Sequence, residues 1–423
     1  MSHPTIALAR IDGPRGAEPA TTIGYVGIHV ACLAALWTGV SAGDLVLCGV
    51  SYVIRMFGLS AGYHRYFSHR AFKTSRAGQF VLALLGTLGV QRGVLWWASR
   101  HRHHHRYSDT DEDIHSPLYR GFAYSHSGWF LDRRNTGTDL ARVQDLTRYP
   151  ELVWLNDWNV APVLAYGALL WLMFGTSGFV WGFCVSTVLL WHGIHAIGSF
   201  GHRFGGYRRF ATTDNSRNKW FLGLVLLGEG WHNNHHFYPT SARTGHRWWE
   251  VDPVYWVLAA LQRVGLVWDV RTPPARVMDA TDPHEQAQVR HFEGWLMELR
   301  VRLGEVIGTA PPDAVPAAVI RPLQEAVEMH LDDFGARATA EIIEDPERLA
   351  ATMALLRANV ASECILRAGA PGLAGGLEVE LIDAARTSAF ATFFAGPRGG
   401  SAPAGLEVAG GGRVGGGARR RAS

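Results

Sequence analysis

The sequence is poor in cysteine and in charged residues for its length. Its 423 residues include four cysteines, and no two of them have the spacing of a disulfide framework or a metal-binding motif. This excludes a small disulfide-stabilised scaffold. Charged residues make up 18%, below the value of about 25% that is usual for soluble domains. The formal net charge of +3 gives no indication of nucleic-acid binding.

Long apolar runs take the place of the missing charges. Residues 23–40 contain no charged side chain, and at a rise of about 1.5 Å per residue they cross most of a hydrocarbon core about 30 Å thick. Three further apolar runs follow, at residues 45–63, 160–174 and 179–200. The connectors 41–44 and 175–178 pair the four runs as two hairpins. We therefore predict an all-α integral membrane protein with four transmembrane helices; two hairpins buried in a soluble helical core are the alternative.

Basic residues predict the orientation in the membrane. The two short connectors contain no lysine or arginine, whereas residues 64–157 contain thirteen. Because basic loops stay in the cytoplasm, both hairpins should point outward and both termini should lie inside. Residues 1–21 are then a cytosolic N-terminal segment, without the features of a cleavable signal peptide.

The chain is predicted to divide into a membrane domain and a C-terminal extension. The membrane domain covers residues 22–280. Within it, the apolar stretch 80–97 is interrupted by the polar tripeptide QRG at 91–93. We interpret this stretch as a helix along the cytoplasmic face, because a fifth span would put the next histidine cluster on the opposite side of the membrane from the first. Residues 281–396 are charged and amphipathic, which predicts a helical extension of unknown role. Residues 397–423 are rich in glycine and arginine, a composition typical of a disordered tail.

Histidines give the most specific signal in the chain. Ten of the twenty histidines fall in four short segments within or beside the basic parts. On an α-helix successive side chains turn by about 100°, so the members of an HxxHH triple lie on one face and can converge on a metal ion. His103 lies about 200° from His101 and is excluded. Nine candidate metal ligands remain: His64, His69, His101, His104, His105, His202, His232, His235 and His236.

The number of histidines predicts two metal ions. Imidazole suits Zn, Cu, Fe and Ni, and one such ion takes at most about six ligands. His64 and His69 are about 140° apart on an ideal helix, so this pair needs a helix end or two ions on either side of it. The alternatives are a loose histidine-rich tract and ordinary hydrogen-bonded core histidines, as expected for His29, His126 and His192.

Acidic residues beside the histidines are expected to orient the imidazole rings. A metal-bound histidine usually donates its other N–H to a carboxylate or a carbonyl. We predict this role for Asp109, Asp113 and Glu229. Asp111 follows the same histidine segment, and Glu112 is equally well explained as a solvated loop acid.

Three segments resemble a known family. They are GYHRYFSHRAF at 62–72, WWASRHRHHHRYSDTDEDIHSP at 96–117 and GEGWHNNHHFYPTSAR at 228–243. Together they are similar to the three histidine boxes of membrane fatty-acyl desaturases. The resemblance extends over roughly residues 22–270 and points to the acyl-CoA Δ9 (stearoyl-CoA type) desaturases of the bacterial branch.

The resemblance implies a fold and a ligand set. In this family, four transmembrane helices carry a cytosolic helical cap that holds a diiron centre. On this sequence the eight box histidines become iron ligands, and His202 matches a ninth. The chain departs from the family at Gly198, where an asparagine usually holds a metal-bound water. His195, about one turn earlier, could compensate, although a packed histidine explains it equally well.

The implied activity is O2-dependent desaturation. An unactivated methylene resists acid, base and nucleophile, so redox chemistry with O2 and two electrons is required. The resemblance implies a cis double bond at Δ9 of a long-chain acyl thioester such as acyl-CoA, formed at the bacterial inner membrane. No HPGG-type cytochrome b5 motif appears, so we expect a separate electron donor of the ferredoxin, rubredoxin or cytochrome b5 type. Candidates for lining the acyl tunnel are Trp96, Trp97, Trp231 and Trp248, each also explicable as an interface aromatic.

Two other functions compete with desaturation. A histidine-box hydroxylase or monooxygenase of lipids or alkanes shares the iron chemistry but typically has different box spacing and more spans. A membrane metal-binding or transport protein would carry its polar ligands within the spans. The HRHHH and NNHH boxes favour desaturation.

Overall fold

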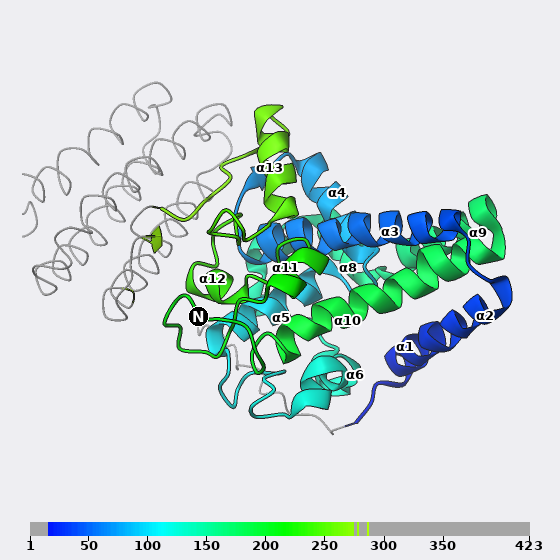
Figure 1. Cartoon of the computed structure of the whole chain (residues 1–423), viewed down its shortest axis with the longest axis horizontal. Helices are drawn as coiled ribbons and strands as arrows, with labels where there is room; N and C mark the ends of the chain where they lie inside the picture. The colour runs from blue at the N-terminus through cyan, green and yellow to red at the C-terminus, as the bar shows by residue number, and fades with distance from the viewer. Residues whose placement is uncertain (1–15, 275–276, 279–285, 287–423) are drawn as a thin grey trace, which may run out of the picture. The chain divides into compact units, whose positions relative to one another are not determined.

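The computed structural model of the chain (Figure 1) describes residues 16–274, 277, 278 and 286. The predicted extension at 281–396, apart from Gln286, and the predicted tail at 397–423 lie outside the described residues. The described part is mostly helical, as predicted. It also contains one small antiparallel sheet, in which β1 (Lys73–Thr74) pairs with β2 (Val267–Trp268).

Within the described residues, three helical runs are long and apolar enough to cross a membrane. The first, Pro19–Thr38, consists of α1 (Pro19–Ala31), η1 (Cys32–Ala34) and α2 (Ala35–Thr38). The second, Ala42–Ser68, consists of α3 (Ala42–Phe57) and the π-helix η2 (Gly58–Ser68). The third, Val160–Ser199, consists of α9 (Val160–Phe179), η6 (Val180–Val185) and α10 (Ser186–Ser199). The sequence predicts four runs, and Val160–Ser199 contains both the third and the fourth.

Gly175 interrupts this third run with a non-helical conformation, φ 68° and ψ −163°. Gly39, between the first and second runs, has almost the same angles, φ 70° and ψ −162°. Glycine reaches a positive φ without a Cβ clash. Both reversals lie at the same end of the long helices, near the labels α2 and α9 (Figure 1). Asp44 connects them, because its carboxylate accepts from Ser177 Oγ at 2.7 Å and from the Ser41 N–H at 2.8 Å.

The long helices expose apolar side chains and bury their charge. Leu36 and Trp37 are 87% and 88% exposed, and a continuous apolar surface of this kind is typical of contact with lipid. Arg55, the only charge within residues 45–63, is buried between helices. Its guanidinium donates to Thr187 Oγ1 at 2.7 Å and to the Ser51 carbonyl at 3.2 Å, which provides the partners that an ionised side chain within a span requires.

The single helix predicted over residues 80–97 is wrong. The structure has two helices there, α4 (Arg76–Thr87) and α5 (Val94–Tyr107). Val90 and Arg92, in the segment between them, adopt positive φ values of 58° and 62°. The break therefore falls at the polar QRG sequence, and it turns the chain so that α5 begins as a new helix.

Further short elements complete the described part. After α5 come η3 (Tyr124–Gly128), α6 (Trp129–Leu131), η4 (Arg133–Asn135), η5 (Leu140–Arg142), α7 (Gln144–Thr147) and α8 (Pro150–Asp157). After α10 come α11 (Trp220–Val225), α12 (His232–Phe237) and α13 (Pro253–Arg263). Helices α5 and α12 lie at the end of the long helices opposite to α2 and α9 (Figure 1).

Glycines allow η2 to pack tightly on α4. A Cβ at Gly58 would lie 2.3 Å from the Leu85 carbonyl carbon, and a Cβ at Gly62 would lie 2.7 Å from the Leu82 oxygen. Such distances are below van der Waals contact, so only glycine fits at this crossing. The contact fixes η2, which carries the first pair of candidate histidines, against the core.

Candidate metal centre

The structure brings all nine candidate histidines together. They form two clusters, and within each cluster one imidazole nitrogen per residue lies within 4.8 Å of the others. The five-histidine cluster contains His64, His69, His101, His105 and His235. The four-histidine cluster contains His104, His202, His232 and His236. The clusters adjoin each other, since the rings of His105 and His236 are stacked with centroids 4.4 Å apart.

A π-helix places His64 and His69 in the same cluster. The His69 N–H donates to the His64 carbonyl at 3.3 Å, the five-residue spacing of a π-helix. In an ideal α-helix the two side chains would diverge by about 140°. Here their ring centroids are 5.0 Å apart. The sequence leaves open whether this pair lies at a helix end or serves two ions. In the structure a π-helix ends beside His69, and both histidines belong to one cluster.

Each HxxHH triple is divided between the two clusters. On α5, His101 and His105 belong to the five-histidine cluster and His104 to the four-histidine cluster. On α12, His235 belongs to the first, whereas His232 and His236 belong to the second. Each triple therefore serves two neighbouring sites. The physical reason is that residues i+3 and i+4 differ by about 100°, so one helical face can serve two neighbouring sites.

Histidine nitrogens face each other at short distances. His69 Nε2 and His101 Nε2 lie 2.8 Å apart. His235 Nε2 lies 2.9 Å from both His64 Nε2 and His105 Nε2. In the other cluster, the Nε2 atoms of His202 and His232 are 2.9 Å apart. By contrast, His103 belongs to neither cluster, and its Nε2 lies 2.9 Å from the Glu112 carbonyl oxygen.

Four carboxylates hold imidazoles by the opposite ring nitrogen. Nδ1 of His104 lies 3.1 Å from Asp113, and Nδ1 of His202 lies 2.8 Å from Asp109. His64 Nδ1 contacts Glu229, as the sequence predicts for these three acids. Carboxylates in this position fix the orientation of a metal-binding ring and raise its basicity.

The fourth carboxylate, Asp214, was missed by the sequence analysis. Asp214 Oδ2 lies 2.7 Å from His236 Nδ1. In the sequence, Asp214 lies outside the three histidine boxes, and no spacing rule connects it to His236. Its position is also fixed locally, because Asp214 Oδ1 accepts from the Ser216 N–H at 3.0 Å. Of the remaining acids, Asp111 and Glu112 offer only backbone carbonyls to Arg120 and His103.

Burial favours the neutral form of most cluster imidazoles, whereas contact with an imidazole keeps a carboxylate such as Asp109 ionised. Burial, with a smaller contribution from neighbouring imidazoles, lowers the pKa of five cluster histidines well below its ordinary value: His69, His101, His105, His232 and His235. Burial also lowers the pKa of His236, which Asp214 partly restores, to about 4. For Asp109, burial raises the pKa, but the hydrogen bond and charge of His202 outweigh it and give about 2. Neutral imidazoles are the form that binds metal ions.

The arrangement fits metal ions. His236 Nε2 is buried and has no hydrogen-bond partner among the described residues. Facing nitrogens 2.8–2.9 Å apart suit ligands that each lie about 2.0–2.1 Å from an ion. Imidazole donors suit iron as well as zinc or copper, and the two clusters provide one site each.

A cavity reaches both clusters. It has an empty volume of about 780 Å³, including its open mouth, and His64, His101, His104 and His232 line it. Its walls also include Trp96 and Trp97, two of the four predicted tunnel residues, together with apolar side chains of α10. The other two lie elsewhere: Trp231 is buried and donates Nε1–H to the Val251 carbonyl at 2.8 Å, and Trp248 is 87% exposed.

The histidine nearest to Gly198 is His115, not His195. A Cβ at Gly198 would lie 3.4 Å from His115 Nδ1, and no side-chain atom of His195 lies within 4 Å of it. His195 is buried, lines the cavity and lies 3.5 Å from Ser127 Oγ through Nδ1. His115 also lines the cavity and forms a third potential metal-binding group with His104 and Asp113. The sequence analysis did not select His115.

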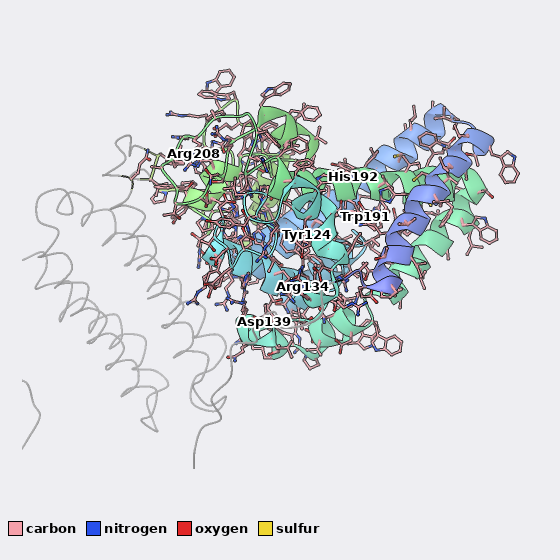
Figure 2. All side chains as sticks on the ribbon, turned by 90° about the horizontal axis from the view of Figure 1, so that it is seen from below. Tyr124, Arg134, Asp139, Trp191, His192 and Arg208 are labelled. Carbon is pink, nitrogen blue, oxygen red and sulfur yellow. The ribbon has the colours of Figure 1, made fainter. Side chains whose placement is uncertain are left out.

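The three histidines predicted as hydrogen-bonded core residues form a hydrogen-bonded chain at the long helices. His192 Nε2 lies 3.0 Å from His29 Nε2, and His192 Nδ1 lies 2.9 Å from His126 Nε2. His192 lies on α10 beside Trp191 (Figure 2). The three are hydrogen-bonded, as predicted, but each is at least partly exposed, so they are not core residues. They belong to neither metal-binding cluster.

The part of the chain that matches known proteins contains the whole candidate metal centre. The fatty acid desaturase family matches residues 35–272. The chain is similar to acyl-CoA 5-desaturase AL21 of Anemone leveillei, with 36% identity over 58% of this chain and 77% of the relative. It is 35% identical to the sn-1 stearoyl-lipid 9-desaturase of Anabaena variabilis, over 59% of this chain and 92% of the relative. It is also 33% identical to the hex-5-enoyl-[acyl-carrier protein] acetylenase of Moorena producens, over 60% of this chain and 85% of the relative.

Proposed function

The chain belongs to the fatty acid desaturase family, and from this premise we propose that it is an O2-dependent desaturase that introduces a cis double bond at Δ9 of a long-chain acyl thioester. One observation carries the proposal: nine histidines form two adjoining clusters, and members of both clusters line one apolar cavity. In this proposal the nine histidines hold two iron ions, five on one and four on the other. Acyl-CoA is the proposed thioester.

The residues of the chain divide the work of the reaction. Bound iron supplies, with O2 and two electrons, the oxidising power that an unactivated methylene requires. The carboxylates of Asp109, Asp113 and Asp214 orient three imidazoles of the four-histidine cluster. Trp96 and Trp97 form part of the apolar wall that excludes water from the acyl chain. Overall, the acyl chain loses two hydrogens, and O2 with two electrons and two protons becomes two waters.

We propose that the long helices cross the membrane four times. The run Val160–Ser199 has 40 residues, and at about 1.5 Å per residue it is about twice as long as a hydrocarbon core is thick. A reversal at Gly175, with its non-helical φ of 68°, divides it into two spans. The basic segment 64–157 then favours a cytoplasmic cap, with both termini on the cytoplasmic side of the bacterial inner membrane.

The acyl carrier and the electron donor are the least constrained parts of the proposal. The printed names of the relatives include a CoA ester, a lipid and an acyl-carrier protein as carriers. Arg100 lines the cavity and donates to the Gly137 carbonyl at 2.6 Å, and we propose its positive charge as a partner for a thioester headgroup. Electrons come from a separate protein of the ferredoxin, rubredoxin or cytochrome b5 type.

The test is expression in a bacterial host with a simple lipid profile. Mass spectrometry of the fatty acids should show products that have lost two hydrogens, with the double bond located at carbon 9. A product that has gained one oxygen would identify a hydroxylase. Unchanged lipids in a membrane fraction that contains iron-loaded protein and a suitable electron donor would favour a metal-binding protein without desaturase activity. Supplying acyl-CoA, acyl-carrier-protein or phospholipid substrates to that fraction then identifies the carrier.

A further inference from the structure

The two clusters differ by one nitrogen ligand. Five histidines form one cluster and four form the other, although iron takes up to about six ligands in either case. The four-histidine cluster therefore has more room for a ligand that does not come from these histidines. The question is which side chain is placed to hold such a ligand.

His115 occupies the right place. Its ring packs against His104, with centroids 4.4 Å apart. Asp113 contacts both residues, because its carboxylate accepts from the His115 backbone N–H at 3.1 Å and lies 3.1 Å from His104 Nδ1. His115 is thus fixed next to the four-histidine cluster by the same carboxylate that orients one of the cluster's rings.

The side-chain nitrogen of His115 is buried and free to act. Nδ1 has no hydrogen-bond partner among the described residues, and the closest acidic oxygen, Asp113 Oδ1, is 3.8 Å away. A buried imidazole nitrogen without a partner costs free energy, on the order of 1–3 kcal/mol, unless a ligand satisfies it. Gly198 faces this nitrogen and has no side chain that could do so.

His115 is not itself within reach of the whole cluster. It groups with His104 and Asp113 within 4.8 Å, but not with His202, His232 and His236. A direct bond to the same ion is therefore not its role in this geometry. A small polar molecule between the ring and the cluster would bridge the gap, since water satisfies buried polar groups in such positions.

We propose that His115 is a positioning residue of the metal centre, whose imidazole holds a water molecule on the cavity side of the four-histidine cluster, beside Gly198. This inference rests on the proposed diiron function. It assigns a role to a loop histidine that the HxxHH spacing does not select.

The test is Mössbauer spectroscopy of the full-length protein loaded with ⁵⁷Fe, together with the iron content per chain. The wild type should hold one iron in each cluster and give two distinguishable doublets, because the two ligand sets differ. His115→Ala should retain both irons and change the doublet of one site only. His103→Ala is the matched control, since His103 lies on α5 outside both clusters, and it should leave both doublets unchanged.

Two further variants keep the test decisive. His115→Asn retains a polar group if the alanine variant does not fold, as judged by helical circular dichroism, and should shift the same doublet by less. In His115→Ala/Gly198→Asn, the new amide projects toward the space vacated by the imidazole, because a Cβ at 198 points at the His115 ring from 3.4 Å. This double variant should restore the wild-type doublet.

The outcomes separate the inference from the proposed function. Unchanged doublets in His115→Ala and His115→Asn would overturn the role of His115 while leaving the diiron centre intact. Loss of one iron from these variants would also overturn it, because His115 would then be needed for metal binding itself. A wild-type protein that fails to bind iron in both clusters would overturn the proposed function and, with it, this inference.

Discussion

The two histidine clusters use the same side chain but are held in different ways. All four members of the four-histidine cluster are buried, and three of their rings contact a carboxylate. In the five-histidine cluster three members are only partly buried, and among the described residues Glu229 is the one carboxylate in contact, through His64. The difference shows two ways to orient an imidazole: hydrogen bonds from loop acids on one side, and packing of helices on the other.

The helices of the five-histidine cluster are themselves strongly anchored. Glu229 is shared with Arg65, whose buried guanidinium lies 3.0 Å from Glu229 and 3.0 Å from Asp252. Gly58 and Gly62 fix η2 against α4. The four-histidine cluster instead depends on loops that carry Asp109, Asp113 and Asp214. The comparison therefore predicts that changes in polar partners act mainly on the four-histidine cluster.

The largest effect is expected from removing a ring that points into a cluster. His104→Ala should abolish the unsaturated product. It should also lower the iron affinity of the four-histidine cluster by more than the roughly 100-fold that loss of an outer hydrogen-bond partner costs. His103→Ala, one residue earlier, should retain most of the product because its ring faces the Glu112 carbonyl. Fatty-acid analysis and iron content measure both. Equal losses in the two variants would show that the register of α5 differs from the one described.

Acid should destabilise the apoprotein through the histidines of both clusters whose pKa is lowered by burial. Buried rings such as His105, with a pKa well below its ordinary value, are protonated in the unfolded chain before they are in the folded one, so stability is full above about pH 6.5 and falls as the pH decreases. For His236, with a pKa of about 4, the loss between pH 6.5 and 4 is on the order of 3 kcal/mol. His104 has the opposite sign: burial lowers its pKa, but Asp113 outweighs burial and raises it.

A matched pair of variants tests this difference. Glutamine does not titrate in this range, so His105→Gln should flatten the dependence of the unfolding midpoint on pH, measured in detergent between pH 7 and 5 without metal. His104→Gln should steepen it. Identical slopes in the two variants would contradict the opposite pKa shifts of His105 and His104.

Loss of one loop carboxylate should have a smaller effect, confined to the four-histidine cluster. Asp214→Asn weakens the contact with His236 Nδ1, and we expect iron affinity at that cluster to fall by about 10–100-fold. Competition with a chelator measures this affinity, and the Mössbauer doublet of each site shows which cluster has lost iron. Asp111→Asn is the control, because Asp111 is exposed and contacts neither cluster. An equal loss at both clusters would show that Asp214 supports the fold as a whole.

The sequence predicts the members of the site better than their division. The nine histidines and three of the four carboxylates are predicted from the sequence. A helical period of about 100° per residue describes one helix at a time and does not say how helices meet. The split of each triple depends on how η2, α5 and α12 meet, which is a property of packing. The π-helix that unites His64 and His69 has no marker in local composition, and Asp214 reaches His236 only through the fold of its loop.

The same limit applies to the membrane helices. Their existence follows from long apolar runs, and the reversal at Gly175 lies within the predicted connector. The apolar content of residues 80–97 suggested one helix, but the positive φ values of Val90 and Arg92 divide it into two. A break of this kind depends on backbone conformations that neither residue type prefers, so the surrounding packing decides it.

The smallest expected effect comes from the far end of the described residues. Gln286 Oε1 accepts from the Ala211 N–H at 2.8 Å, and its Nε2 lies 3.5 Å from the Arg209 carbonyl oxygen. These contacts hold the segment that leads to Asp214, so Gln286→Ala should weaken iron binding at the four-histidine cluster by a few-fold, about what a single hydrogen bond of roughly 1 kcal/mol provides, and leave the five-histidine cluster unchanged. Removal of residues 397–423 is the control: the family match ends at residue 272 and all nine histidines precede it, so iron content and product should both stay at the wild-type level. A Gln286→Ala variant that alters the doublet of the five-histidine cluster, or a shortened chain that folds and binds iron but forms no double bond, would show that the C-terminal part acts on the centre by another route.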